Sequence, residues 1–275
     1  MKKKVKVTSV ILFIICVLIA LIMLIPFVWM VSASFKQNTE IFETPYRWIP
    51  QVFNFANYKR VWTQVNFLQY YLNTVKVTVI SVVIQVITCS LAAFAFTKLK
   101  FPGRDKIFFA YIATMMVPWN AIMIPQFVII KSLGLYDTHA ALILIGSFNA
   151  FGVFLLRQNM LSIPGEMNEA AKIDGCGVLR TYWNIIMPLS KGSVATLIIL
   201  SFNQVWNDYM APMIYLDSDT KKTIQLGLAS FKQQYKADYG AIMAGTVCAV
   251  IPIIIVYAFA QKYIIDGMAH AGVKG

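Results

Sequence analysis

The chain has 275 residues, of which 59% are hydrophobic and only 13% are charged. Globular domains carry about 25% charged residues, so this composition excludes an ordinary soluble fold and indicates that lipid is the main solvent. The formal net charge is +12. We attribute it to membrane topology and to attraction by anionic lipid of the inner leaflet, and we expect no nucleic-acid partner.

Six apolar stretches approach the ~20 residues that a helix needs to cross ~30 Å of hydrocarbon. They predict an all-α integral membrane protein with six transmembrane helices. We read the first stretch as an uncleaved span, because it is longer than the apolar core of a signal peptide. The predicted spans are residues 10–34, 74–96, 107–130, 140–156, 193–215 and 241–260.

The distribution of basic residues predicts the orientation. With a cytoplasmic amino terminus, the inner segments hold more than half of the 24 Lys and Arg residues. By the positive-inside rule, both termini are therefore expected in the cytoplasm. The predicted parts are a first helix at 1–35, an extracytoplasmic segment at 36–73, a five-helix core at 74–262 with a cytoplasmic loop at 157–192, and a cytoplasmic tail at 263–275.

The extracytoplasmic segment at 36–73 is dense in aromatic residues. Such rings anchor proteins at the membrane surface, and they also suit a cap that meets a delivery protein. The sequence favours neither interpretation.

Isolated cysteines and histidines indicate neither a disulfide framework nor a metal site. The four cysteines form no CxxC pair, and the two histidines stand far apart. We expect no metal, no cofactor and no catalytic residue. The residues concerned are Cys16, Cys89, Cys176, Cys248, His139 and His270.

The loop between the fourth and fifth spans predicts a helix, a turn and a second helix. Pro164 starts the first helix, Gly175 and Gly177 break it, and Pro188 ends the second helix, predicted at 178–186. Small and charged residues on the first helix suit docking into a groove of another protein. From composition alone, an amphipathic loop lying on the inner leaflet is the better interpretation of a helix of this length.

The string Glu169-Ala170-Ala171-x-x-Asp174-Gly175 resembles the EAA loop of permease subunits of ABC importers, and Tyr182, Ile185 and Pro188 follow at matching positions. The resemblance extends over nearly the whole chain, through segments such as Phe101-Pro-Gly-Arg104, Trp206-Asn-Asp208 and the final Ala271-Gly-Val-Lys-Gly275. Together these segments look like the maltose-permease-like subunit of carbohydrate importers, in its shorter six-span form. One departure is Gly192, where many relatives have a second proline.

This resemblance implies a type I ABC importer permease in a bacterial cell membrane. Such a subunit pairs with a second related permease, docks its loop into one of two cytoplasmic ABC ATPases, and receives carbohydrate from an extracytoplasmic solute-binding protein. ATP binding and hydrolysis would then alternate the access of the pathway. No nucleotide site is expected on this chain, because residues 267–274 resemble a phosphate loop but have Val273 where its lysine should stand.

Polar residues at membrane depth are candidates for the substrate path, because they are costly in lipid and usually face a cavity or a bundle interior. Amides bind hydroxyl groups, and aromatic faces stack on sugar rings. The alternative is that these side chains join helices to one another. The candidates are Trp119, Asn120, Asn203, Asn207 and Asp208.

Other functions fit less well. A membrane enzyme would need convergent acids or metal ligands, and a secondary transporter would need an inverted repeat. A permease of the same importer class for amino acids or peptides stays as the alternative, since the loop motif is shared. Charged solutes would favour opposing charge in the spans, whereas the path candidates are mostly amides and aromatics.

Overall fold

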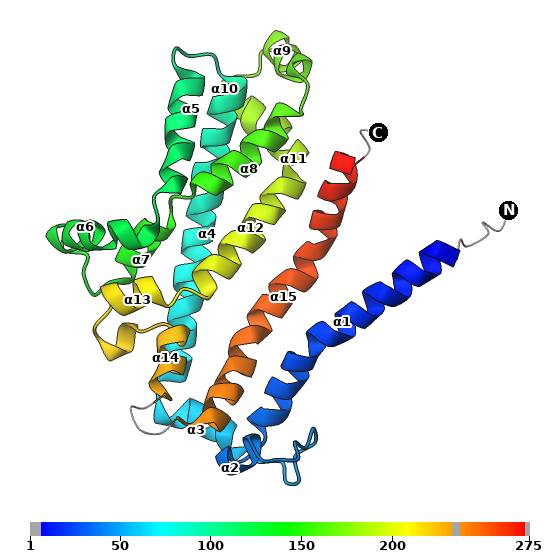
Figure 1. Cartoon of the computed structure of the whole chain (residues 1–275). Helices are drawn as coiled ribbons and strands as arrows, with labels where there is room; N and C mark the ends of the chain where they lie inside the picture. The colour runs from blue at the N-terminus through cyan, green and yellow to red at the C-terminus, as the bar shows by residue number, and fades with distance from the viewer. Residues whose placement is uncertain (1–6, 233–236, 273–275) are drawn as a thin grey trace. The chain divides into compact units, whose positions relative to one another are not determined.

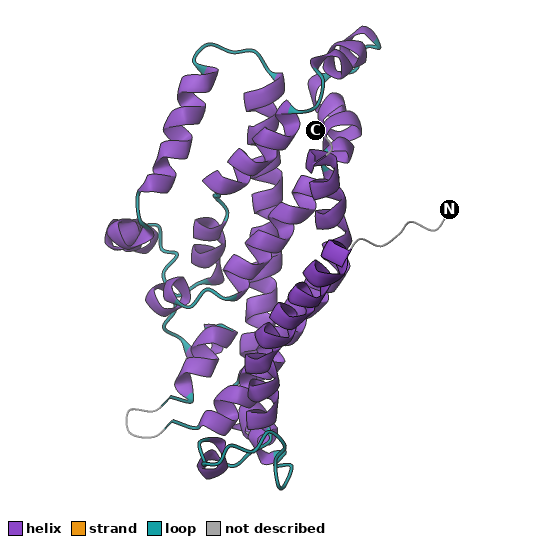
Figure 2. Ribbon diagram, turned by 45° about the vertical axis from the view of Figure 1, so that its right-hand side comes forward, coloured by secondary structure: helices purple, strands orange, loops and turns teal. Residues whose placement is uncertain are grey.

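The computed structural model describes residues 7–232 and 237–272, with side chains described up to Lys262. The described residues form helices and loops (Figure 2), with one isolated β-bridge between Lys232 and Ala237. The predicted basic amino terminus and the side chains of the predicted tail at 263–275 lie outside the described residues. The helices are α1 (Val7–Ser34), α2 (Asn38–Ile41), α3 (Ala56–Gln64), α4 (Phe67–Lys98), α5 (Arg104–Ala113), α6 (Trp119–Ser132), α7 (His139–Gly146), α8 (Ala150–Leu161), α9 (Gly165–Ile173), α10 (Val178–Thr181), α11 (Met187–Leu189), α12 (Lys191–Trp206), α13 (Met210–Tyr215), α14 (Ile224–Ser230) and α15 (Tyr239–Gly272).

The predicted fold class is confirmed. Four helical segments of the described chain are long and apolar enough to cross a membrane, and two bent helix pairs bring the number to six if each pair is one span. The four segments are α1, α4, α7 with α8 (His139–Leu161), and the described part of α15 (Tyr239–Lys262). They extend the predicted spans by a few residues at their ends.

The third span, predicted at 107–130, is bent. α5 and α6 meet at an angle of 100° after a short 3-10 turn at Thr114–Met116. The cause is local: Val117 is extended (φ −81°, ψ 113°), because the following Pro118 disfavours helical backbone at the residue before it. α6 therefore projects away from the direction of α5 (Figure 1).

The fifth span differs from the prediction at both ends. α12 ends at Trp206, and a separate short helix, α13, follows, so the predicted helix at 193–215 is interrupted at residues 207–209. At the other end, α12 meets the Val178–Leu189 segment at 80°. The second loop helix continues beyond the predicted residue 186. The helical segment Val178–Leu189, with a π-helical stretch at Tyr182–Ile186, ends one residue after Pro188.

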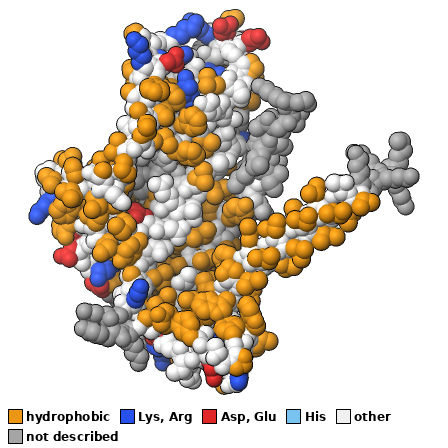
Figure 3. All heavy atoms as spheres, in the orientation of Figure 1, with side chains coloured by type: hydrophobic (Ala, Val, Ile, Leu, Met, Phe, Trp, Pro, Cys, Tyr) orange, Lys and Arg blue, Asp and Glu red, His pale blue; other side chains and the backbone are white. Residues whose placement is uncertain are grey.

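The described residues divide into two compact units. The first consists of residues 1–67 and 227–250, and the second of residues 68–226 and 251–275. In the first unit, α1 exposes apolar side chains along its length (Figure 3), as expected of a lipid-facing span. The fully buried Asn57 donates to the carbonyls of Ser34 and Lys36, and Arg60 pairs with Asp238 at 2.6 Å. These bonds fix the end of α1 against α3 and the start of α15.

The second unit is organised around α4. At one end, a buried cluster joins α4, α8, the π-helical segment Tyr182–Ile186 and α12; it includes Cys89, Phe94, Leu156, Tyr182 and Leu197. A second cluster, which includes Val77, Leu142 and Tyr215, joins α4 to α7 and α13. Figure 1 shows α9 at one end of α4, and α13 beside the other half of α4.

Candidate functional site

A cavity of about 900 Å³ lies within the second unit. Its size falls in the ~300–1,000 Å³ range of pockets for small molecules. The walls are mostly apolar, with several amide and hydroxyl side chains. Its polar lining consists of Thr74, Thr78, Gln85, Tyr111, Thr114, Trp119, Gln126, Asn149, Gln204, Asp208 and Thr223.

Three interrupted spans meet at this cavity. Trp119 lines it at the bend of the third span, Asn149 at the break between α7 and α8, and Asp208 at the break between α12 and α13. Interrupted helices leave backbone N–H and C=O groups unpaired, and at membrane depth these are tolerated only beside protein or water. The three breaks therefore converge on one cavity with a partly polar lining and are not unrelated kinks.

Side chains cap two of the broken helix starts. The Asn149 side chain accepts a bond from the Gly152 N–H at 2.9 Å, at the start of α8. The Asp208 carboxylate accepts from the Ala211 N–H at 3.2 Å, at the start of α13. Each cap satisfies a donor that has no partner within its own helix.

Gln85 of α4 binds both sides of the break between α7 and α8 in the fourth span. It is buried, with 2% of its surface exposed. Its amide nitrogen donates to the Gly146 carbonyl, and its oxygen accepts from the Asn149 amide at 3.1 Å and the Ser201 hydroxyl at 2.6 Å. One side chain thus links α4 to the α7–α8 break and to α12.

The predicted path residues fall into two groups. Trp119 and Asp208 line the cavity, and the Trp119 indole donates to Gln126 at 3.1 Å. Asn120, Asn203 and Asn207 are exposed and are not among the lining residues. The Asn207 amide donates to the Asn203 side chain at 2.9 Å, along one face of α12.

Gln85 and Asn149 were not predicted. Gln85 was detectable as a lone amide in a long apolar run, and Asn149 as a capping residue before an apolar helix. Neither signal says which distant groups the side chain will meet. No group of three or more His, Cys, Asp or Glu in residues 7–232 and 237–272 could hold a metal ion.

A second candidate site is the α9 loop, residues 162–190 between α8 and α12. The carboxyl end of α9 closes in a Schellman motif. The Cys176 N–H donates to the Ala171 carbonyl at 2.8 Å, and the Gly175 N–H donates to the Lys172 carbonyl at 3.1 Å. Gly175 has φ +76°, a backbone that other residues resist. The predicted helix, turn and glycine break are confirmed here.

The residues of the Glu169 to Pro188 motif divide by exposure. Ala171 and Tyr182 are buried, and the Tyr182 hydroxyl bonds Ser90 of α4 at 2.6 Å. Ile185 is half-buried. Glu169, Ala170, Asp174, Gly175 and Pro188 are exposed.

Large apolar side chains are also exposed on the α9 loop: Met167, Ile173, Val178, Leu179 and Trp183. Tyr182 therefore ties the loop to α4, while the α9 surface combines an exposed acid with exposed apolar groups. Such a surface is suited to a protein partner.

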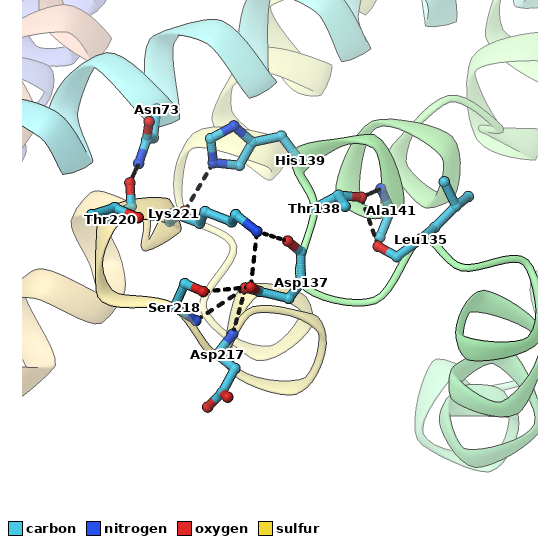
Figure 4. A network of polar contacts seen from close by, with 10 residues as sticks. All are labelled: Asn73, Leu135, Asp137, Thr138, His139, Ala141, Asp217, Ser218, Thr220 and Lys221. Carbon is cyan, nitrogen blue, oxygen red and sulfur yellow. Dashed lines mark hydrogen bonds and ion pairs between the residues drawn. The ribbon is translucent and has the colours of Figure 1, made fainter.

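A polar network stabilises the opposite end of the second unit (Figure 4). Asp137, in the turn between α6 and α7, accepts bonds from the N–H groups of Asp217 and Ser218, each at 3.0 Å, and from the Ser218 hydroxyl. The Lys221 ammonium lies 2.9 Å from the same carboxylate. These donors, Ser218 first, hold the pKa of Asp137 well below its usual range.

Comparisons with known proteins all find membrane components of transport systems. Residues 85–270 match the family described as binding-protein-dependent transport system inner membrane component. The putative ABC transporter permease protein ORF2 of Caldicellulosiruptor sp. is 36% identical over 255 residues, which cover 91% of this chain and 92% of the relative. The arabinooligosaccharides transport system permease protein AraQ of Halalkalibacterium halodurans is 31% identical over 260 residues, covering 94% of this chain and 93% of AraQ.

A solved structure is similar over its whole length. A chain from the crystal structure of a bacterial ABC transporter involved in the import of the acidic polysaccharide alginate superposes with a TM-score of 0.80 at 29% identity. The match covers 95% of the present chain and 99% of that chain.

Proposed function

Since this chain belongs to the family of binding-protein-dependent transport system inner membrane components, we propose that it forms, with a second permease, the membrane pathway of a carbohydrate importer. The resemblance noted at the Glu169 motif is confirmed by the family match. The chain is a multi-pass protein of the bacterial plasma membrane with the fold of an ABC importer permease. It is a transport subunit, and in such importers separate subunits hydrolyse ATP.

The observation that carries the proposal is the cavity at which three interrupted spans meet. A transport pathway needs polar groups in the middle of the bilayer, and broken helices supply them at places where their backbone groups remain satisfied. Carbohydrate is supported by the amide, hydroxyl and indole groups of the lining, and by the relative named for arabinooligosaccharides.

The partners follow from the family. Dependence on a binding protein is part of the family description, and we infer that this binding protein is extracytoplasmic. We infer in addition a second related permease and two cytoplasmic ATPases, each of which receives one permease loop. The exposed acid and apolar side chains of the α9 loop support this role of α9. Membrane lipid covers the exposed apolar surface of α1.

Uptake by the complete importer in proteoliposomes tests the function. We expect Trp119→Ala to lower sugar uptake several-fold while the assembled complex and its basal ATPase activity remain. The matched control is Ile124→Ala, which removes an exposed apolar side chain from the same helix outside the cavity lining.

Unchanged uptake in the Trp119 variant would contradict a path through this cavity. Uptake of amino acids or peptides, with no uptake of sugars, would contradict the substrate class. Asn120, Asn203 and Asn207 stay as predicted path residues, and alanine at each position tests them in the same assay.

A further inference from the structure

We propose that the cavity selects uncharged carbohydrate, and that Asp208 is a specificity residue that disfavours acidic sugars. This proposal rests on the proposed function and narrows its substrate class. Similarity alone does not decide whether the sugar is charged, because AraQ is named for arabinooligosaccharides and the solved importer is described with an acidic polysaccharide.

The charges of the lining carry the argument. Asp208 is the one charged residue among the described residues that line the cavity, and no Lys, Arg or His is among them. Proteins recognise carboxylates mainly through Arg and Lys, whose charge-assisted bonds offset the loss of hydration. A uronate in this cavity would give up water, find no cation in the lining, and lie near a like charge.

The free backbone N–H groups at the start of α13 do not replace a cation as the binding partner of an acidic sugar. A helix start has free N–H groups that would otherwise attract an anion. Here the Asp208 carboxylate accepts from the Ala211 N–H at 3.2 Å, so this position already holds a negative group. The start of α8 is likewise capped, by the Asn149 amide oxygen.

An uncharged sugar meets suitable groups in the same lining. The amides of Gln126 and Gln204 can donate to and accept from hydroxyl groups, and a carboxylate such as Asp208 accepts from them. The half-buried Trp119 presents an aromatic surface for the apolar face of a pyranose. The lining therefore matches hydroxyl groups and lacks a cationic partner for a carboxylate.

The test compares pairs of sugars that differ only in their carboxyl groups, two in the first pair and one in the second. Galactobiose and digalacturonate form one pair, and cellobiose and cellobiouronate form another. Binding is measured on the purified complex of both permeases and both ATPases, without the binding protein, so that the selectivity of the binding protein does not enter. The readout is the quenching of Trp119 fluorescence by bound sugar. The Trp119→Phe complex gives the signal of all other tryptophans, which is subtracted.

We expect at least one uncharged sugar to bind at least tenfold more tightly than its acidic partner. Asp208→Asn should narrow this gap several-fold, because asparagine keeps the capping oxygen for α13 but removes the charge. The matched control is Asp217→Asn, which removes a carboxylate outside the cavity lining and should leave the gap unchanged.

Two results would overturn the proposal: equal or tighter binding of the acidic sugars by the unmodified complex, or an unchanged gap in Asp208→Asn. Both leave carbohydrate transport intact. The proposed function fails by a different result, in which no sugar of either kind binds or is transported while amino acids or peptides are.

Discussion

Asp137 shows how one residue can determine the structure of a loop. It has φ +57°, which is uncommon for a residue other than glycine, and asparagine and aspartate tolerate this backbone best. Its carboxylate accepts hydrogen bonds from the backbone N–H groups of Asp217 and Ser218 and pairs with the Lys221 ammonium (Figure 4). A turn at the end of α6 is thereby joined to a segment about 80 residues later in the chain.

The depressed pKa of Asp137 predicts a pH dependence with a definite sign. A group whose pKa is lowered by folding contributes stability that is present above its unfolded value, about 4, and is lost as the pH falls. We therefore expect the thermal stability of the purified complex to drop below about pH 4, and Asp137→Asn to show a smaller drop in that range.

Thermal unfolding from pH 3 to pH 7 measures this effect. Asp217→Asn is the control, because Asp217 takes part in the network through its backbone N–H and not through its carboxylate. The same acid dependence in Asp137→Asn as in the unmodified chain would show that Asp137 does not cause it.

At the scale of the element, the break between α7 and α8 depends on Gln85. Gln85→Leu would leave the Gly146 carbonyl, the Asn149 amide and the Ser201 hydroxyl without this partner. Each unpaired buried group costs about 1–3 kcal/mol. We expect a clear loss of thermal stability and of sugar uptake.

Val83→Leu is the control for Gln85→Leu, since Val83 lies on an exposed face of the same helix. Gln85→Glu keeps the accepting oxygens but loses the donor to Gly146, and should be intermediate. If Gln85→Leu is as stable as the unmodified chain, other groups must form the hydrogen bonds that Gln85 makes at the break between α7 and α8.

The second element is α9, which we propose as the segment that docks into the ATPase. Glu169→Lys reverses an exposed charge, and Gly175→Val places a branched side chain at φ +76°, which costs about 1–2 kcal/mol. We expect both variants to insert into the membrane with the partner permease but to retain less ATPase on purification and to transport less sugar.

Gly177→Val is the matched control for Gly175→Val. Gly177 lies in the same turn but has φ −69°, and no atom lies within 4 Å of an added Cβ. Normal ATPase retention and uptake in both Glu169→Lys and Gly175→Val would contradict the coupling role.

At the scale of the whole molecule, we predict the orientation in the membrane. Cys176 in the α9 loop and Ser218 lie toward opposite ends of the second unit, near α9 and α13 respectively (Figure 1). The excess of basic residues in the predicted inner segments places Cys176 in the cytoplasm. A membrane-impermeant thiol reagent should label Ser218→Cys in intact cells and should label Cys176 only after the cells are opened.

Each cysteine is tested alone, with the other native cysteines replaced. The reverse pattern, with Cys176 labelled in intact cells and Ser218→Cys protected, would mean that the orientation is inverted. The proposed docking of α9 into a cytoplasmic ATPase would then fail as well.

The sequence alone determined the class of the protein, the apolar stretches that form its candidate spans, and the first helix and glycine turn of the α9 loop. These features depend on local properties: the length of apolar runs, the punctuation by proline and glycine, and the spacing of the Glu169 motif. Pro118 was visible too, but a proline inside a span can produce either a mild kink or a full bend.

Only the tertiary structure decided where the breaks lie in space and that they meet at one cavity. Gln85 reaches the Gly146 carbonyl across 61 residues and the Ser201 hydroxyl across 116. A polar residue in an apolar run shows that some partner must exist, because an unpaired polar group in lipid is costly. Which partner it finds, and whether it joins helices or lines a cavity, depends on how distant helices pack, and local sequence does not encode that choice.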